Sequence, residues 1–131
     1  MKEYVKNRKQ TRSVELYARI LHFLTKRNRY LSPDITAELL ARELECTSPQ
    51  ISVAVRVGGD ANFSALLNEL RLKEACKRMA SSRYTSRTAE DIALGCGYKS
   101  RQAFYTAFER HFGMTPRQWR LEHCPNSENE E

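Results

Sequence analysis

The chain has 131 residues, enough for one small domain or for two very small units that share a helix. Its 22 Lys and Arg and 16 Asp and Glu give a formal net charge of +6. Residues 124–131 hold three Glu and no basic residue, so 22 basic and 13 acidic residues leave residues 1–123 at +9. Such an excess predicts a polyanionic partner, meaning DNA, RNA or an anionic membrane face, although a solvated basic surface would look the same.

Several classes of protein are excluded by the pattern of residues. No apolar run reaches the roughly 18 residues of a membrane span, and residues 1–12 are too polar for a secretory signal. The four cysteines lack the spacing of zinc ligands and are expected to be free thiols, and no metal or cofactor is expected. Scattered histidines and the lack of a glycine-rich phosphate loop also argue against an enzyme. The cysteines are Cys46, Cys76, Cys96 and Cys124.

Apolar residues recur with a period of 3.6 along almost the whole chain, which predicts an all-α fold of about seven short helices and no strand. Capping signals mark several helix starts, and Gly97 and Gly113 are expected to end the helices before them. The start signals are Ser32-Pro33, Ser48-Pro49 with serine as N-cap, Asn62, Ser100 and the capping box of residues 115–118. The predicted helices run over about 13–28, 33–44, 49–58, 62–79, 88–96, 100–112 and from 116 onward.

A self-similar pattern recurs at an offset of 52 residues. Residues 36–41 (TAELLA) resemble residues 88–93 (TAEDIA), and at the same offset residues 48–50 (SPQ) resemble residues 100–102 (SRQ). Each copy is a short helix, a turn and a second helix opened by a serine. This is the layout of a helix-turn-helix, whose second helix enters the major groove of DNA by its N-terminal residues. Two copies joined by a long helix could contact two successive major-groove segments.

The most specific motif lies within residues 89–120. It reads Ile92-Ala93, Gly97-Tyr98, Ser100, Phe104, Phe108, Phe112-Gly113-Met114-Thr115-Pro116 and Arg120. This pattern resembles the C-terminal half of the DNA-binding domain of the AraC/XylS family of bacterial transcription regulators. A weaker likeness continues upstream through Leu40-Ala41, Ser48, Ile51, Phe63 and residues 70–75. The resemblance therefore covers about residues 13–121.

The resemblance implies two helix-turn-helix units joined by a linker helix. The expected division is a basic flexible arm (1–12), a first unit (13–62), a linker helix (63–80), a second unit (81–121) and an acidic tail (122–131). With no room for an effector domain in these residues, the chain resembles the short, stand-alone members of the MarA and SoxS type, although the DNA-binding domain of a longer protein would look the same. These members bind double-stranded DNA as monomers. The resemblance therefore implies that this chain does the same in the bacterial cytoplasm, associated with the nucleoid.

The second recognition helix is expected to read bases. Four of its polar side chains lie opposite the core residues Phe104 and Phe108: Arg101, Gln102, Tyr105 and Thr106. Arginine can bond guanine and glutamine can bond adenine, each as a bidentate pair. The family also places base contacts at these positions, although any exposed helix carries such residues. Phosphate contacts are expected from Lys99, Ser100, Arg110, Thr115 and Arg117, whereas Arg120 could bind a phosphate or form a structural salt bridge.

The first recognition helix departs from the family pattern. Val53 and Val55 stand where the family commonly has arginine and phenylalanine, and alternating valines favour a strand. Candidates for base contacts remain Ser48, Gln50 and Ser52, with Arg56 for a phosphate. We expect this unit to read less sequence, to contact thymine methyl groups, or to bind a protein partner. Lys77 of the linker helix is a further candidate for a phosphate contact. The basic arm could reach phosphates or a minor groove, or it could only add solubility. Its basic residues are Lys2, Lys6, Arg8, Lys9 and Arg12.

Three functions compete. The first is a sequence-specific regulator, an activator by the resemblance, that recruits RNA polymerase and could work with a protein co-regulator. The second is an adaptor or anti-activator with a degenerate first unit. The third is a nonspecific nucleoid-type binder, which would show the same salt dependence without base preference. Base preference in a competition assay separates the first from the others.

Overall fold

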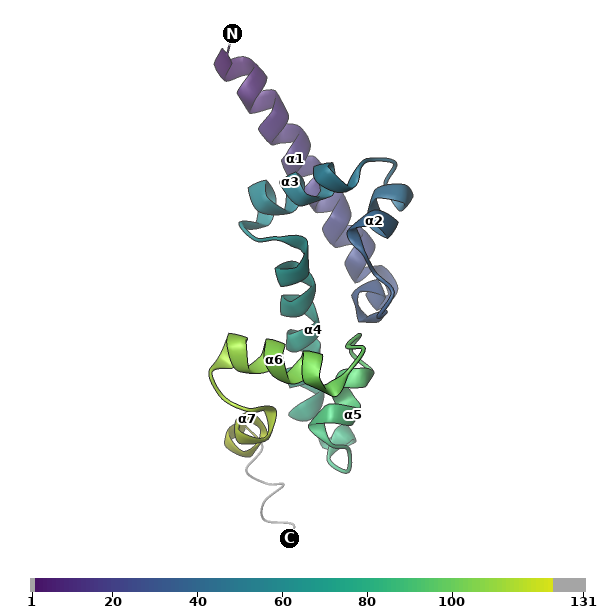
Figure 1. Ribbon diagram of the computed structural model, residues 1–131, viewed down its shortest axis with the longest axis vertical. Helices are drawn as coiled ribbons and strands as arrows, with labels where there is room; N and C mark the ends of the chain where they lie inside the picture. The colour runs from purple at the N-terminus through teal and green to yellow at the C-terminus, as the bar shows by residue number, and fades with distance from the viewer. Residues whose placement is uncertain (1, 124–131) are drawn as a thin grey trace. The chain divides into compact units, whose positions relative to one another are not determined.

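The computed structural model describes residues 2–123, with side chains from residue 8 onward, and this part of the chain is all-helical with no strand (Figure 1). The all-α prediction is therefore confirmed. The elements are α1 (Lys2–Thr25), η1 (Lys26–Leu31), α2 (Ala37–Glu43), α3 (Ser48–Gly59), α4 (Phe63–Met79), η2 (Ser82–Tyr84), α5 (Ala89–Leu94), α6 (Arg101–Phe112) and α7 (Pro116–His123), where η denotes a 3₁₀ helix. No described helix is both long and apolar enough to cross a bilayer.

Two compact units form, and the division between them falls inside α4, after Leu67. The helix expected over 63–80 as a separate linker is thus shared by both units. Its later residues Leu72, Ala75 and Met79 are buried. The helical repeat is retained, because α2 packs on α3 in the first unit and α5 packs on α6 in the second.

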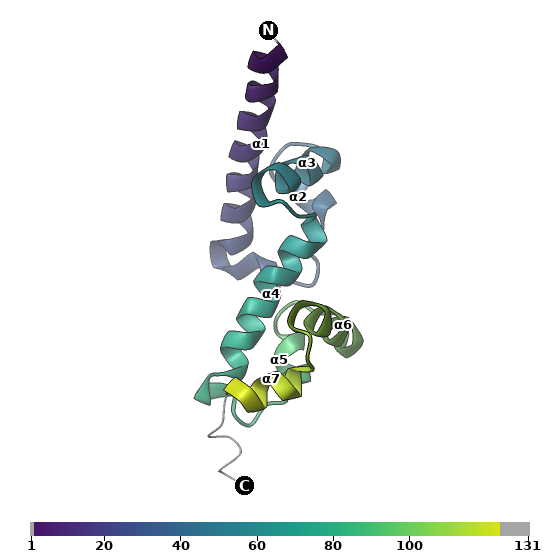
Figure 2. The same ribbon diagram turned by 90° about the vertical axis from the view of Figure 1, so that its left-hand side faces the viewer.

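The first unit is built on α1, which packs along α3 and begins earlier than the sequence suggested (Figure 2). Residues 2–12, expected as a flexible arm, form the first three turns of this helix. Helix α1 ends at Thr25, because Arg27 and Asn28 have positive φ values and continue the chain as η1. The core-facing residues of α1 are Ile20 and Leu24, while Val14, expected on the apolar stripe, is 51% exposed.

Two glycines at the end of α3 allow it to approach α1 closely. A Cβ atom on Gly58 would collide with the ring of Tyr17, and one on Gly59 would lie 2.6 Å from the Tyr17 hydroxyl. Asp60 then ends α3 in the left-handed conformation. The close packing against Tyr17 therefore explains why small residues stand at positions 58 and 59.

Helix starts follow side-chain caps, though not always the residue expected. Thr36 caps α2 and accepts a hydrogen bond from the Leu39 amide at 3.1 Å, so Ser32-Pro33 does not begin that helix. Thr47, not Ser48, is the N-cap of α3. A threonine at either position satisfies one of the free amides of the first turn, which is the physical reason that the helix begins there.

In the second unit, α7 is held in place by Arg120. Its guanidinium donates to three backbone carbonyls, those of Met79 (3.3 Å), Tyr84 (2.7 Å) and Arg87. These carbonyls lie at the end of α4 and in the connection from η2 to α5. Arg120 therefore binds backbone carbonyls, and neither of its expected roles, a phosphate contact or a salt bridge, accounts for these contacts.

Candidate nucleic-acid interface

The second helix-turn-helix is formed by α5, a turn and α6. Thr88 caps α5 and Ser100 caps α6, each accepting a bond from the third amide of its helix at 3.1 Å. Gly97 has the expected left-handed conformation, with φ of 96°, and Tyr98 after it is buried. The Tyr98 hydroxyl donates to the Asn68 Oδ1 at 3.1 Å, so the turn is attached to α4.

One face of α6 is apolar and fully buried, through Phe104 and Phe108. Their rings lie 5.5 Å apart and edge to face, a favourable aromatic geometry. The opposite face carries Gln102 and Thr106, which are exposed. Arg101, expected on that face, lies three and seven residues before Phe104 and Phe108 and so on their side of the helix, and it is exposed because it is the first residue of α6. An exposed polar first turn is the part of a helix that a recognition helix uses to contact bases.

The side chains that are candidates for base contacts differ in the hydrogen bonds that they form within the protein. Arg101 has no hydrogen bond or ion pair with any other residue in the described part of the chain, and its guanidinium is exposed. Gln102 Nε2 donates to Thr106 Oγ1 at 3.2 Å, so these two side chains orient one another. Tyr105 is half-buried, and its hydroxyl donates to the Glu90 carboxylate on α5. Tyr105 thus has a structural partner, which would have to be released before its hydroxyl could donate to a base.

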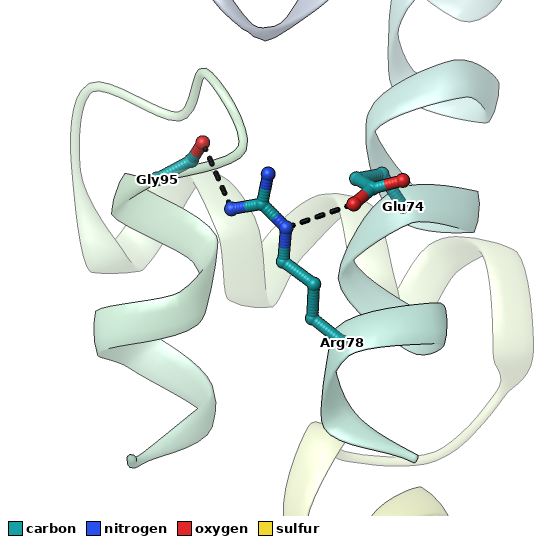
Figure 3. Close-up of polar contacts among 3 residues, drawn as sticks. All are labelled: Glu74, Arg78 and Gly95. Atoms are coloured by element: carbon teal, nitrogen blue, oxygen red, sulfur yellow. Dashed lines mark hydrogen bonds and ion pairs between the residues drawn. The ribbon is translucent and has the colours of Figure 1, made fainter. Parts of the chain in front are cut away.

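The Arg78 guanidinium forms a clamp between α4 and the turn that follows α5, as Figure 3 shows. Arg78 of α4 forms an ion pair with Glu74 at 2.8 Å and donates to the Gly95 carbonyl at 3.4 Å. Partial burial acts to lower the pKa of Arg78, but the hydrogen bond to Glu74 and the nearby Cys96 and Tyr84 together raise it. Sequence reasoning missed this clamp, although the spacing of Glu74 and Arg78 by four residues on a helix is a recognisable signal.

The candidate phosphate contacts of the second unit surround α6. Lys99, Arg110 and Arg117 are exposed. The Ser100 oxygen accepts the Ala103 amide as a cap, which leaves its hydroxyl hydrogen to donate to a phosphate. Thr115 and Gln118 form the expected capping box, with bonds of 2.9 and 3.1 Å, so the first amides of α7 are partly used.

The first helix-turn-helix matches the second with a change of register. The caps Thr36 and Thr88 of α2 and α5 are 52 residues apart, as are the positive-φ residues Glu45 and Gly97. The caps Thr47 and Ser100 of α3 and α6, however, are 53 apart. The first turn is therefore one residue shorter, and the sequence alignment of residues 48–50 with residues 100–102 is wrong by one position.

This register changes which residues of α3 correspond to base readers. Ser48 and Pro49 take the places of Arg101 and Gln102, and Ser52 takes the place of Tyr105. Ile51 and Val55 are fully buried, in the positions of Phe104 and Phe108. The pair Ile51 and Val55 corresponds to the pair Phe104 and Phe108, and the separation between the two pairs is 53 residues.

The polar residues of α3 are only partly available to DNA. Gln50 completes a capping box, since its Oε1 accepts from the Thr47 amide at 2.9 Å. Ser48 is half-buried, and Ser52 and Arg56 are exposed. Val53 and Val57 are 40% and 44% exposed, which gives this helix an apolar outer surface. The valine run is nevertheless helical, because the burial of Ile51 and Val55 outweighs local strand propensity.

On α4, the cations have different environments. Lys77 is exposed, and it remains a candidate for a phosphate contact. Burial lowers the pKa of Arg71, and the neighbouring Tyr98 opposes this effect, which favours a structural role for Arg71. Burial also raises the pKa of Tyr98 to about 12.

The cysteines provide a test of the packing around α4. Cys46, Cys76 and Cys96 are free thiols, and Cys124 lies outside the described residues. Burial raises the pKa of Cys76 and Cys96 to about 11. At pH 8 each thiolate should be about 100-fold scarcer than for a thiol of pKa 9, so alkylation by iodoacetamide should slow by about that factor. Peptide-resolved mass spectrometry of native and urea-unfolded chains measures this, and equal rates in the two states would contradict the burial. Among the side chains that the structure describes, those of residues 8–123, no group of three or more His, Cys, Asp or Glu could hold a metal ion.

Comparisons with known proteins agree with this arrangement. A family model described as a helix-turn-helix domain matches residues 40–122. The HTH-type transcriptional activator RhaR of Klebsiella pneumoniae is 37% identical over 51 residues, a match that covers 39% of this chain and 18% of RhaR. The chain thus spans only a small part of that relative's length.

Solved structures share the fold. A protein of unknown function from Listeria innocua has a TM-score of 0.71 at 20% identity, over 81% of this chain and 95% of that one. The C-terminal domain of AraT, a response regulator from Geobacillus stearothermophilus, has a TM-score of 0.66 at 20% identity, over 88% and 86%. A transcriptional regulator with an AraC-type DNA-binding domain from Chromobacterium violaceum has a TM-score of 0.61 at 21% identity, over 92% and 96%.

Proposed function

This chain belongs to the AraC/XylS family of helix-turn-helix transcription regulators, and on that premise we propose that it is a bacterial, sequence-specific activator that contacts two successive major-groove segments. It binds duplex DNA as a monomer and recruits RNA polymerase by direct contact, and a protein co-regulator could modulate it. The observation that carries this proposal is the exposed polar row at the start of a capped, well-packed helix, α6. Arg101, Gln102 and Thr106 form that row.

The two units are expected to read DNA unequally. The second unit presents an exposed guanidinium and an amide, which discriminate guanine and adenine by bidentate bonds. The first unit presents Ser48, Pro49 and Ser52 at the matching positions, with Val53 beside them. Proline and valine offer only van der Waals contact, for example with thymine methyl groups. We therefore assign most of the base readout to α6.

Selection of binding sites from random duplexes tests the proposal. The selected sites should extend over about two helical turns, with strong base preference in one half and weak or thymine-biased preference in the other. Competition against random DNA at physiological salt should then favour the selected site by well over tenfold. A preference below tenfold would contradict a sequence-specific regulator. It would support nonspecific binding, in which the affinity depends on salt but not on the base sequence.

A specific observation supports an adaptor or anti-activator as the second candidate. The exposed side chains of Val53 and Val57 are one helical turn apart on α3, where a recognition helix commonly carries polar residues. An apolar helix face of this kind suits a protein partner better than it suits a phosphate backbone. Under this alternative, substitution of both valines by threonine would abolish partner binding and leave the selected DNA site unchanged.

A further inference from the structure

A groove of about 610 Å³ lies in the first unit, between α1 and the beginning of α3. Lys9, Arg12 and Arg19 line it from α1, and Pro49, Gln50 and Val53 line it from α3. The spacing of the three cations, by three and seven residues, places them on one stripe of the helix. The basic stripe of α1 therefore faces the N-terminal end of the first recognition helix.

Helix α3 itself brings little charge to DNA, because Arg56 is its one cation. When the N-terminal end of a recognition helix enters the major groove, the phosphate backbones run along both of its flanks. The turns of α1 that carry Lys9 and Arg12 lie on one of those flanks, across the groove from Pro49 and Gln50. Both cations are exposed, as a phosphate contact requires.

We propose that this groove holds one strand of the DNA backbone, with Lys9 and Arg12 as its phosphate contacts, so that α1 supplies the charge that α3 lacks. The inference rests on the proposed DNA-binding function and adds a binding surface to it. Two carboxylates, Glu15 and Glu45, also line the groove. Arg19 donates to the Leu44 carbonyl at 3.2 Å and is thereby held near the turn. The phosphates are therefore expected at the end of the groove that Lys9 and Arg12 form.

The test compares the full chain with the double variant Lys9→Ala/Arg12→Ala. The affinity for a site selected from random duplexes, and for a random duplex of equal length, is measured by titration at several salt concentrations. Each lost phosphate contact lowers the slope of log affinity against log salt by about 0.9, so the double variant should lose about 1.8 on both duplexes. The base preference of the protein should not change, because phosphate contacts carry no sequence information.

A matched control removes the same charge just beyond the far end of α1, in η1. The variant Lys26→Ala/Arg27→Asn changes residues roughly 20 Å from Arg12 along the axis of α1, and asparagine tolerates the positive φ at position 27. This control should retain the slope of the unchanged protein. The variant Glu15→Gln, which removes a carboxylate from the groove, should tighten binding to both duplexes.

The outcomes separate this inference from the proposed function. If the unchanged protein selects no site, the proposed function fails and the inference fails with it. If it selects a site but Lys9→Ala/Arg12→Ala retains its slope, only the inference is overturned, and the groove is then free for a protein partner. Equal losses in the double variant and in the Lys26→Ala/Arg27→Asn control would likewise overturn it, since they would show a general effect of net charge. Circular dichroism confirms that each variant is folded.

Discussion

Replacing Arg120 with alanine is expected to lower the free energy of unfolding by about 3 kcal/mol. The guanidinium donates to the carbonyls of Met79, Tyr84 and Arg87, which belong to segments 33 to 41 residues away in sequence. Charged hydrogen bonds contribute about 1.5–3 kcal/mol each, and the partial exposure of the side chain reduces their total. Urea denaturation followed by circular dichroism measures the change as a lower midpoint at an unchanged slope.

Arg117→Ala is the matched control for this prediction. Arg117 lies on the same helix, α7, and is exposed, so its removal should change the stability by less than about 0.5 kcal/mol. The variant Arg120→Lys should remain nearly as unstable as Arg120→Ala, because one ammonium group cannot match the fork of a guanidinium that reaches three carbonyls. A stability of Arg120→Ala equal to that of Arg117→Ala would show that the three bonds contribute little.

Replacing Arg101 with alanine should cost about 1–3 kcal/mol of affinity for the selected site, or roughly 5- to 150-fold, and should relax the preference at one base pair. The exposed side chain at the first position of α6 has no hydrogen bond or ion pair with other described residues that would have to be broken first. Repeating the site selection with the variant protein measures both effects. The position at which the preference disappears identifies the base that Arg101 reads.

Arg110→Ala serves as the comparison, since Arg110 lies in the last turn of α6 and is assigned to a phosphate. Its loss should weaken binding to every sequence by a similar factor and leave the base preference unchanged. If Arg101→Ala produced this uniform loss instead, Arg101 would be a phosphate contact. The proposal that α6 reads bases would then rest on Gln102 and Thr106 alone.

Local features of the fold were predictable where the interactions are local in sequence. The caps at Ser100 and Thr115 bond to amides three residues onward, so a short motif is sufficient to locate the helix start. The left-handed Gly97 was predictable for the same reason, because it depends on the backbone preference of one residue. The start of α2 was missed because Thr36 competes with Ser32-Pro33 four residues earlier, and both are valid capping signals.

Site residues were less predictable, because their availability depends on distant partners. Tyr105 was a candidate base reader, but its hydroxyl donates to Glu90 on a different helix. Gln50 was another, and its amide oxygen is used to cap α3. Residue type and helix face indicated that both side chains could reach DNA, and neither feature shows which competing hydrogen bond forms within the protein.

The sequence by itself determined the helical period, the caps at Ser100 and Thr115, the repeat of two helix-turn-helix units and the apolar face of α6. Each of these depends on residues within a few positions of one another. Only the tertiary structure decided the register of α3, where Ile51 and Val55 are buried in place of two phenylalanines. It also decided that Arg120 binds backbone carbonyls, and that the helical turns of α1 line a groove with α3. The last two features join segments that are roughly 30 to 40 residues apart, and the balance of packing that selects them is not contained in any short stretch of the chain.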